Sequence, residues 1–161
     1  MKYRIYCDGA ASNNGYENAI GGWAFVVLDE NENVVCEDSE MVKGATNNRM
    51  ELFAAYQGLT QLLETKEDIE GIEVYTDSAY LHNCIIQKWY ENWIKNGWRN
   101  SKKQPVANKG LWEYLIPFFV EPRVHFYKVK GHNGDKWNEY VDDLAVAART
   151  KWEESNESSD N

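Results

Sequence analysis

Three acidic residues in this chain stand at positions from which they could bind metal ions together. Asp8 directly follows the strand-like residues "YRIYC", and Asp77 directly follows the strand-like residues "IEVYT". Glu51 lies near the start of a helical pattern that begins at Asn48. Carboxylate oxygens, in a chain with only three histidines, suit Mg²⁺ or Mn²⁺, and pairs of these ions serve phosphoryl-transfer chemistry. These residue types favour a metal-dependent nuclease or polymerase.

Each of these acids also has a purely structural explanation. Asp8 and the glycine after it are typical of a turn, and Asp77 and the serine after it are typical of a helix N-cap. Asn48-x-x-Glu51 has the spacing of a capping box, in which the glutamate folds back onto the helix start. However, Glu51 lies at the border of the helix's apolar stripe, which directs its side chain along the sheet surface toward the strand ends.

A fourth acid could come from the last helical pattern of the chain. That pattern carries Glu139, Asp142 and Asp143. Asp142 and Asp143 flank its apolar stripe on opposite sides, so the helical wheel alone does not choose between them. Carboxylates brought together raise one another's pKa unless cations neutralise them, which again favours a metal site.

The elements that must position these acids alternate between strand and helix periodicity. Three strand-like stretches come first, then a helix, a short apolar strand, two helical patterns, a strand and a last helix. This order predicts an α/β fold with a mixed sheet and helices on its faces, in which ligands bind where strands end. The predicted ranges are 3–7, 22–29, 33–42, 48–65, 72–77, 78–95, 110–119, 123–129 and a final helix through 148.

Composition limits the domain organisation and the compartment. The 161 residues suffice for one domain, which we place at 1–152, and the acidic stretch 153–161 is expected to be a disordered tail. The net charge of -9 argues against a broad basic surface. No apolar run is long enough to span a membrane. Three widely spaced cysteines suggest neither disulfides nor a zinc cluster, which favours a reducing cytoplasm. We expect a cytoplasmic monomer without a membrane partner.

One stretch contradicts the acidic average. Between Gln87 and Lys109, a range called the basic segment below, six cations stand against one acid, a local charge of +5. Three tryptophans are interleaved with these cations. They could simply pack a helical hairpin onto the body, but rings among cations also suit nucleic-acid backbones. The cations are Lys88, Lys95, Arg99, Lys102, Lys103 and Lys109.

Four blocks together resemble the type 1 ribonuclease H family. They are "YCDGA", "GATNNRMEL", "VYTDSAY" and "VKGHNGDKWNEYVDDLA", and their order and spacing match from about Tyr3 to Ala148. The resemblance implies a ribonuclease H-like fold, with a five-stranded mixed sheet of three antiparallel then two parallel strands and helices on both faces. It also implies an endonuclease that cleaves the RNA strand of RNA/DNA hybrids with two divalent ions, leaving 5'-phosphate and 3'-hydroxyl ends. Mg²⁺ is the expected ion, and Mn²⁺ is a substitute.

The resemblance assigns roles to individual residues. Asp8, Glu51, Asp77 and Asp142 match the four metal-binding carboxylates, which resolves the choice in the last helix. His132, in "KGHNG", matches a loop histidine that shuttles protons or helps product release.

The resemblance also implies substrate contacts. Asn14, Asn47 and Asn48 match residues facing the RNA groove, and Thr46 and Asn108 match residues that hold a DNA phosphate. The basic segment resembles a protrusion that grips the DNA strand, so Lys88, Lys95, Arg99, Lys102 and Lys103 are assigned to phosphates and Trp89 to a DNA sugar. Turn or cap chemistry is the alternative for the polar residues.

The chain departs from the pattern at one contact, and two rival functions remain. Ala79 stands where the family often has a glutamine that reaches the minor groove. A transposase or integrase core would share the fold and a carboxylate set, but it would lack the "KGHNG" loop and the basic segment. A catalytically inactive hybrid-binding module would be expected to have lost a carboxylate, whereas all four matching positions are acidic.

Overall fold

A five-stranded mixed sheet forms the centre of the computed structural model, which describes residues 1–12, 18–130 and 135–159, from 152 on only as backbone. The strand order is β3-β2-β1-β4-β5. The first three strands are antiparallel neighbours, and β4 and β5 run parallel to β1. This confirms the predicted fold class. The bounds are β1 Lys2–Ser12, β2 Ile20–Leu28, β3 Val34–Lys43, β4 Gly71–Thr76 and β5 Val124–Lys128.

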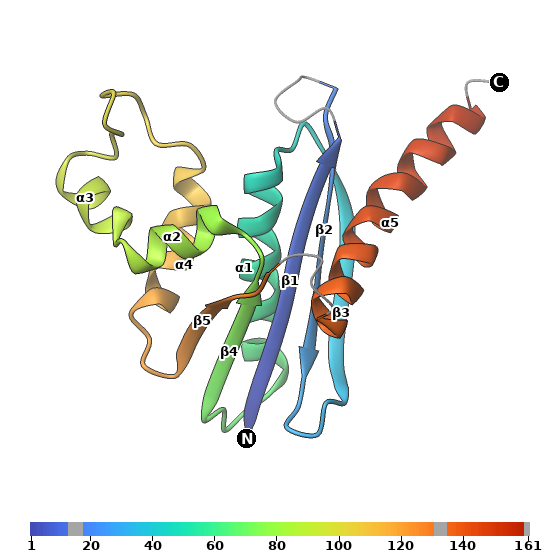
Figure 1. Ribbon diagram of the computed structural model, residues 1–161, viewed down its shortest axis with the longest axis horizontal. Helices are drawn as coiled ribbons and strands as arrows, with labels where there is room; N and C mark the ends of the chain where they lie inside the picture. The colour runs from blue at the N-terminus through green and yellow to red at the C-terminus, as the bar shows by residue number, and fades with distance from the viewer. Residues whose placement is uncertain (13–17, 131–134, 160–161) are drawn as a thin grey trace.

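Helices cover both faces of this sheet, as Figure 1 shows. One helix, α5, packs on one face against β1, β2 and β3, while α1 packs on the opposite face against β1 and β2. The short helices α2, α3 and α4 lie on the side of β4 and β5, and α3 stands away from the sheet (Figure 1). The bounds are α1 Asn47–Thr65, α2 Ala79–Ile86, α3 Trp89–Lys95, α4 Lys109–Phe119 and α5 Lys136–Ser159.

Two apolar cores follow from this layering. The larger lies between the sheet and α1, α2 and α4, and includes Phe25, Leu59 and Trp112. The smaller lies under α5, where Val141 and Ala145 pack against Tyr6 of β1 and against alternate residues of β2. Every residue of β2 is buried because both of its faces are covered. Among the described residues, no helix is both long and apolar enough to cross a membrane.

The structure differs from the sequence prediction in the first strand. Asp8 does not follow β1 but lies within it, paired with Ala24, because the strand continues to Ser12. Among the small residues after Asp8, Ala10 and Ala11 pair with the two glycines near the start of β2, which a pattern search based on apolar alternation does not detect. Between the first two predicted strands, residues 9–12 thus extend β1, and residues 20 and 21 begin β2.

Two helical predictions also needed correction. The range 78–95 is not one helix but two, α2 and α3, because Lys88 adopts a left-handed conformation with φ of 53°. The final helix was predicted through 148, whereas the backbone of α5 continues to Ser159. No glycine or proline occurs between 136 and 159 to end that helix.

Candidate active site

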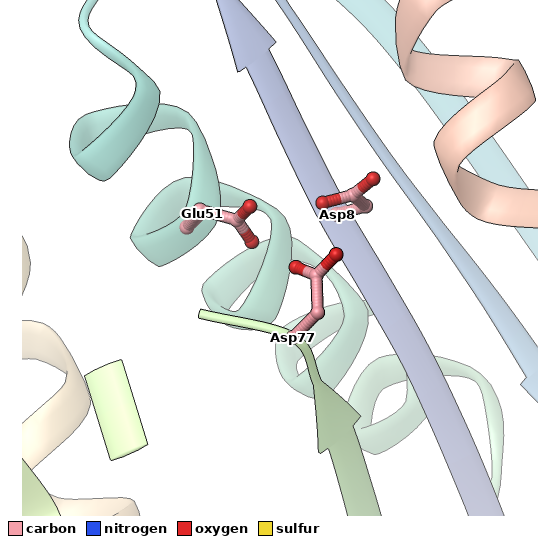
Figure 2. A group of neighbouring side chains, drawn as sticks. All are labelled: Asp8, Glu51 and Asp77. Atoms are coloured by element: carbon pink, nitrogen blue, oxygen red, sulfur yellow. The ribbon is translucent and has the colours of Figure 1, made fainter. Parts of the chain in front are cut away.

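Three of the four predicted carboxylates come together at the C-terminal end of β4. Asp8 comes from the middle of β1, Glu51 from the start of α1, and Asp77 directly follows β4. Figure 2 shows their side chains pointing toward one another. One oxygen of each lies within 4.8 Å of those of the other two. We call these three residues the carboxylate cluster.

Glu51 belongs to this cluster because other residues begin α1. Thr46 is the N-cap, and its Oγ1 accepts a hydrogen bond from the Arg49 N–H at 3.1 Å. The Oδ1 of Asn47 accepts one from the Ala11 N–H at 2.6 Å, which ties the helix start to β1. The capping-box explanation for Glu51 is therefore wrong, and its carboxylate points to Asp8 and Asp77.

Asp77 is likewise not used as a helix cap. The N-cap of α2 is Ser78, whose Oγ accepts a hydrogen bond from the Leu81 N–H at 3.1 Å. Ser78 in turn donates its N–H to the Thr76 Oγ1 at 3.1 Å. These two hydrogen bonds fix the chain on both sides of Asp77 and leave its carboxylate in the cluster.

Burial and mutual repulsion perturb the protonation of the cluster. Burial raises the pKa of Asp8 to about 8; contact with Glu51 opposes this rise, and the charges of Asp77 and Asp142 add to it. Burial, followed by the charge of Asp8, holds the pKa of Glu51 well above its usual range. The neighbouring Cys7 thiol also has a raised pKa, chiefly through its complete burial. The arrangement is thus costly to ionise without a compensating cation.

Asp142 lies near the cluster, and Asp143 does not share its surroundings. The charge of Asp142 acts on the Asp8 carboxyl, although Asp142 lies outside the group of three whose oxygens converge. Asp142 is half-buried beside Val141, which packs on the sheet, whereas Asp143 is exposed. The structure thus separates two residues that the helical wheel left equivalent.

The cluster fits a divalent cation on chemical grounds. All its donors are carboxylate oxygens, which Mg²⁺ and Mn²⁺ prefer. The Glu51 Oε2 is buried and has no hydrogen-bond partner within the described part of the chain. A buried, unpaired carboxylate oxygen is expensive unless a cation or proton compensates it. Asp8, Glu51 and Asp77 are therefore the residues that would hold the ion, with Asp142 beside them.

The predicted substrate-binding residues near α1 lie at its exposed start. Asn47 and Asn48 are exposed, and Thr46 is half-buried. Asn14 and His132 lie outside the described residues. At the other end of the predicted interface, Asn108 adopts a left-handed conformation before α4, and its side chain makes no capping hydrogen bond.

Aromatic packing holds the basic segment together. The Trp93 ring lies 6.3 Å from Trp89, 5.8 Å from Trp98 and 5.4 Å from Trp112, centroid to centroid. Trp112 is fully buried, so this chain of rings joins the segment to the larger core. The Lys109 Nζ lies 5.7 Å from the Trp98 ring centroid.

Two cations of the basic segment, Lys95 and Arg99, line an open groove. The five cations that we assigned to phosphates are exposed, and no carboxylate of the described chain lies within ion-pair distance of them. The groove has a volume of about 550 Å³. Sequence reasoning missed four polar residues of the groove, Asn92, Asn96, Asn100 and Ser101, although the three asparagines recur every four residues. The lining comprises Trp89, Asn92, Trp93, Lys95, Asn96, Arg99, Asn100 and Ser101.

Comparisons with known proteins identify the family. The family model for RNase H matches residues 1–150. A ribonuclease H from Syntrophomonas wolfei is 46% identical over 145 residues, covering 88% of this chain and 91% of that protein. One from Clostridium botulinum is 42% identical over 147 residues, covering 91% of this chain and 95% of that protein.

Solved structures share the fold at lower identity. LC9-RNase H1, described as a type 1 RNase H with the type 2 active-site motif, has a TM-score of 0.76 and 24% identity, covering 93% of this chain and 72% of that one. LC11-RNase H1, solved in complex with an RNA/DNA hybrid, has a TM-score of 0.66 and 24% identity, covering 92% and 97%. With the sequence matches and a carboxylate cluster at the end of β4, the chain belongs to the RNase H family of ribonucleases.

Proposed function

We propose that this chain is an endonuclease that hydrolyses the RNA strand of RNA/DNA hybrids and leaves 5'-phosphate and 3'-hydroxyl ends. The observation that carries the proposal is the carboxylate cluster, with its buried, unpaired Glu51 oxygen, on an RNase H fold. The hybrid bound by the structural relative LC11-RNase H1 supports the choice of substrate.

The four acids hold two divalent ions in this proposal. Asp8, Glu51, Asp77 and Asp142 are the ligands, Mg²⁺ is the expected ion, and Mn²⁺ substitutes for it. When bound, such ions activate a water for attack on phosphorus and stabilise the charge on the departing 3'-oxygen. The chain's own contribution is to position the four carboxylates on β1, α1, α5 and the residue after β4. Asp8 and Glu51 are buried there, and Asp77 and Asp142 are half-buried.

The basic segment binds the DNA strand in this proposal. Its exposed cations contact phosphates, and the half-buried Trp89 lies against a sugar at the rim of the groove. Trp89 is oriented by its Nε1–H, which donates to the Gln87 Oε1 at 2.9 Å. Thr46 and Asn108 hold a further DNA phosphate.

The RNA strand is recognised near the start of α1. The 2'-hydroxyl is the group that distinguishes RNA from DNA, and an amide side chain can both donate to it and accept from it. Asn48 is exposed one turn before Glu51, which favours a contact close to the reacting phosphate. We assign Asn14 and Asn47 to the same groove.

His132 moves protons or helps product release. His132→Ala is expected to slow turnover by about 10²-fold, the lower end of what a positioned acid or base contributes, without abolishing hybrid binding. Turnover and binding are measured separately, by steady-state cleavage and by equilibrium titration of a labelled hybrid. Equal loss in both would remove His132 from this role.

The test of the proposed function is cleavage of labelled duplexes in Mg²⁺. The wild type should cut an RNA/DNA hybrid, and leave duplex DNA and duplex RNA whole. Asp8→Asn and Asp77→Asn should bind the hybrid without cutting it. A wild type that binds but never cuts would instead indicate a hybrid-binding module, and Asn variants that cut as well as wild type would remove the cluster from the chemistry.

A further inference from the structure

Two glycines near the cluster face opposite sides of the sheet, each toward one of the covering helices. In the antiparallel pairing of β1 with β2, Gly9 lies opposite Trp23, and the next pair joins Ala10 to Gly22. Gly9 faces α1, and Gly22 faces α5. These are the two helices that carry Glu51 and Asp142, and both glycines lie close to Asp8 along the paired strands β1 and β2.

Gly9 lets α1 touch the backbone of β1. A Cβ atom at this position would collide with the backbone carbon of Met50 and would lie 2.5 Å from the Met50 Cβ. It would also lie 2.6 Å from the backbone nitrogen of Glu51. Because two of these three atoms are backbone, no change of rotamer relieves the collision. The helix would have to move away, and Glu51 would move with it.

Gly22 lets α5 touch the backbone of β2 in the same way. A Cβ atom there would collide with the carbonyl oxygen of Ala145 and lie 3.2 Å from the backbone nitrogen of Arg149. Ala145 comes three residues after Asp142, less than one helical turn along α5. A side chain at position 22 would therefore displace the part of α5 that carries Asp142.

We propose that Gly9 and Gly22 are positioning residues for the metal site, Gly9 setting the reach of Glu51 and Gly22 setting that of Asp142. The inference rests on the proposed function, since it assumes that these carboxylates act together with Asp8. Small displacements matter here: a misplacement of about 1 Å in a catalytic arrangement can cost about 10²-fold in rate. Neither glycine touches substrate, so each acts through the acid that its helix carries.

A third glycine of the same interface provides the matched control. A Cβ at Gly58 would lie 2.7 Å from the Ile5 Cγ2 and 3.3 Å from the Phe25 Cβ, so alanine there also strains the contact between α1 and the sheet. Gly58 comes seven residues after Glu51, about two helical turns along α1. Gly58→Ala should therefore lower stability without moving the carboxylate cluster.

The experiment compares Gly9→Ala, Gly22→Ala and Gly58→Ala at a temperature where circular dichroism shows each to be folded. Two quantities are measured: the single-turnover rate at saturating Mg²⁺ and hybrid, and the rise in Tm caused by Mn²⁺ without substrate. We expect Gly9→Ala and Gly22→Ala to lose about 10²-fold in rate and most of the metal-induced rise. Gly58→Ala should keep both while its own Tm falls.

A rescue separates positioning from general damage. Glutamate is one methylene longer than aspartate, so Asp142→Glu should recover rate in the Gly22→Ala background, although it lowers the rate of the wild type. Ala145→Ser is a milder variant that adds one atom where α5 packs on the sheet, and Asp142→Glu should rescue it too. If the glycine variants fail to fold, Ala145→Ser with and without Asp142→Glu tests the positioning role instead.

A failure of the positioning role can be distinguished from a failure of the proposed function. If the wild type cuts hybrids, but both glycine variants match Gly58→Ala in rate and metal response, the positioning role is wrong. Absence of rescue in the Ala145→Ser background would also overturn it. A wild type that does not cut hybrids would instead overturn the proposed function, while the metal-induced rise in Tm would still test the geometry.

Discussion

The carboxylate cluster is held by backbone contacts, whereas the basic segment is held by aromatic side chains. Asp8 lies within β1 and Asp77 directly follows the neighbouring parallel strand β4, and α1 meets β1 at Gly9 without an intervening side chain. In the basic segment, Trp93 connects Trp89 and Trp98 to the core through ring contacts of 5.4 to 6.3 Å. The first arrangement fixes positions closely, and the second presents an exposed charged surface.

This difference suits the tasks proposed for the two regions, phosphoryl transfer at the cluster and phosphate binding at the basic segment. Phosphoryl transfer depends on oxygens placed to within a fraction of an ångström, which a sheet end supplies. Binding to phosphates is long-ranged and tolerant of position, so exposed lysines on a packed aromatic support suffice. The chain's net charge of -9 also leaves the +5 segment as a local exception, which directs a polyanion to one side of the molecule.

The largest expected effect comes from removing one carboxylate of the cluster. Asp77→Asn keeps the shape of the side chain but loses its charge, so the single-turnover rate in Mg²⁺ should fall by about 10³-fold or more, because metal-ion stabilisation is worth several kcal/mol. Hybrid binding should persist. Rates and dissociation constants are measured on the same labelled hybrid.

The last helix supplies a matched pair for the same comparison. Asp142→Asn should lose rate as Asp77→Asn does, whereas Asp143→Asn, an exposed neighbour, should retain the wild-type rate. Equal effects of the two substitutions would show that position along α5, relative to Asp8, does not matter.

The next effect is on binding alone. Replacing Arg99, Lys102 and Lys103 with alanine should weaken hybrid binding by about tenfold or more at low salt, and reduce the salt slope by roughly 0.7 to 0.9 for each phosphate that is no longer neutralised. The rate at saturating enzyme should stay unchanged. Fluorescence titration over a range of KCl measures the slope, and Lys66→Ala, outside the segment, serves as the control.

Substitutions of two groove tryptophans should distinguish a residue that binds substrate from one that supports the structure. Trp89→Ala should weaken binding by about tenfold, near the lower end of what a stacked ring contributes, with little change in Tm. Trp93→Ala should lower Tm because Trp93 packs on three other tryptophans. Thermal melts and titrations of both variants check this, and a Trp89→Ala protein that melts early but binds normally would reverse the two roles.

The smallest effect is a pH-dependent change in the stability of the metal-free protein. The Asp8 pKa rises from 3.8 to about 8 on folding, so the unfolded state loses this proton first, and the carboxyl costs stability increasingly as pH rises from about 4 to about 8. In EDTA, Asp8→Asn should therefore raise Tm at pH 8 by at least about 2 °C, the shift that roughly 1 kcal/mol produces in a domain of this size. Near pH 4 the two proteins should melt alike.

Bound metal should reverse the order of the two melting temperatures at pH 8, so that the wild type melts above Asp8→Asn. With excess Mg²⁺ at pH 8, the wild type should be stabilised by binding and the variant should respond less. Asp143→Asn is the control, since its exposed carboxyl should alter neither melt. An Asp8→Asn protein that melts below wild type in EDTA at pH 8 would contradict the account of a repulsive cluster.

Much of this architecture could be predicted from the sequence. The strand and helix order follows from periodicity, and four motifs in a fixed order led to the RNase H family, which the family model and the curated relatives confirm. The structure brings Asp8, Glu51 and Asp77 close together, and their role as metal ligands stays a prediction. The motif blocks succeed here because each one fixes both a carboxylate and the element that carries it.

Other features could not be read from the sequence, for physical reasons. The extension of β1 past Asp8 is built from small residues that have little strand propensity and pair only because β2 lies opposite. The break at Lys88 is a left-handed conformation at a residue that rarely adopts one. Thr46, and not a capping box at Asn48, caps the start of α1. The Glu51 carboxylate lies in the cluster instead, and that position depends on how the sheet and α1 pack.

The central claim is that the cluster performs chemistry and the basic segment performs binding. The most direct test is the single-turnover rate of hybrid cleavage in Mg²⁺, measured as a function of enzyme concentration for two variants. Asp77→Asn should remain at about 10⁻³ of the wild-type rate even at saturation, whereas the alanine variant of Arg99, Lys102 and Lys103 should reach the wild-type rate once enough enzyme is present. A saturating rate that falls as far in the second variant as in the first would contradict the division.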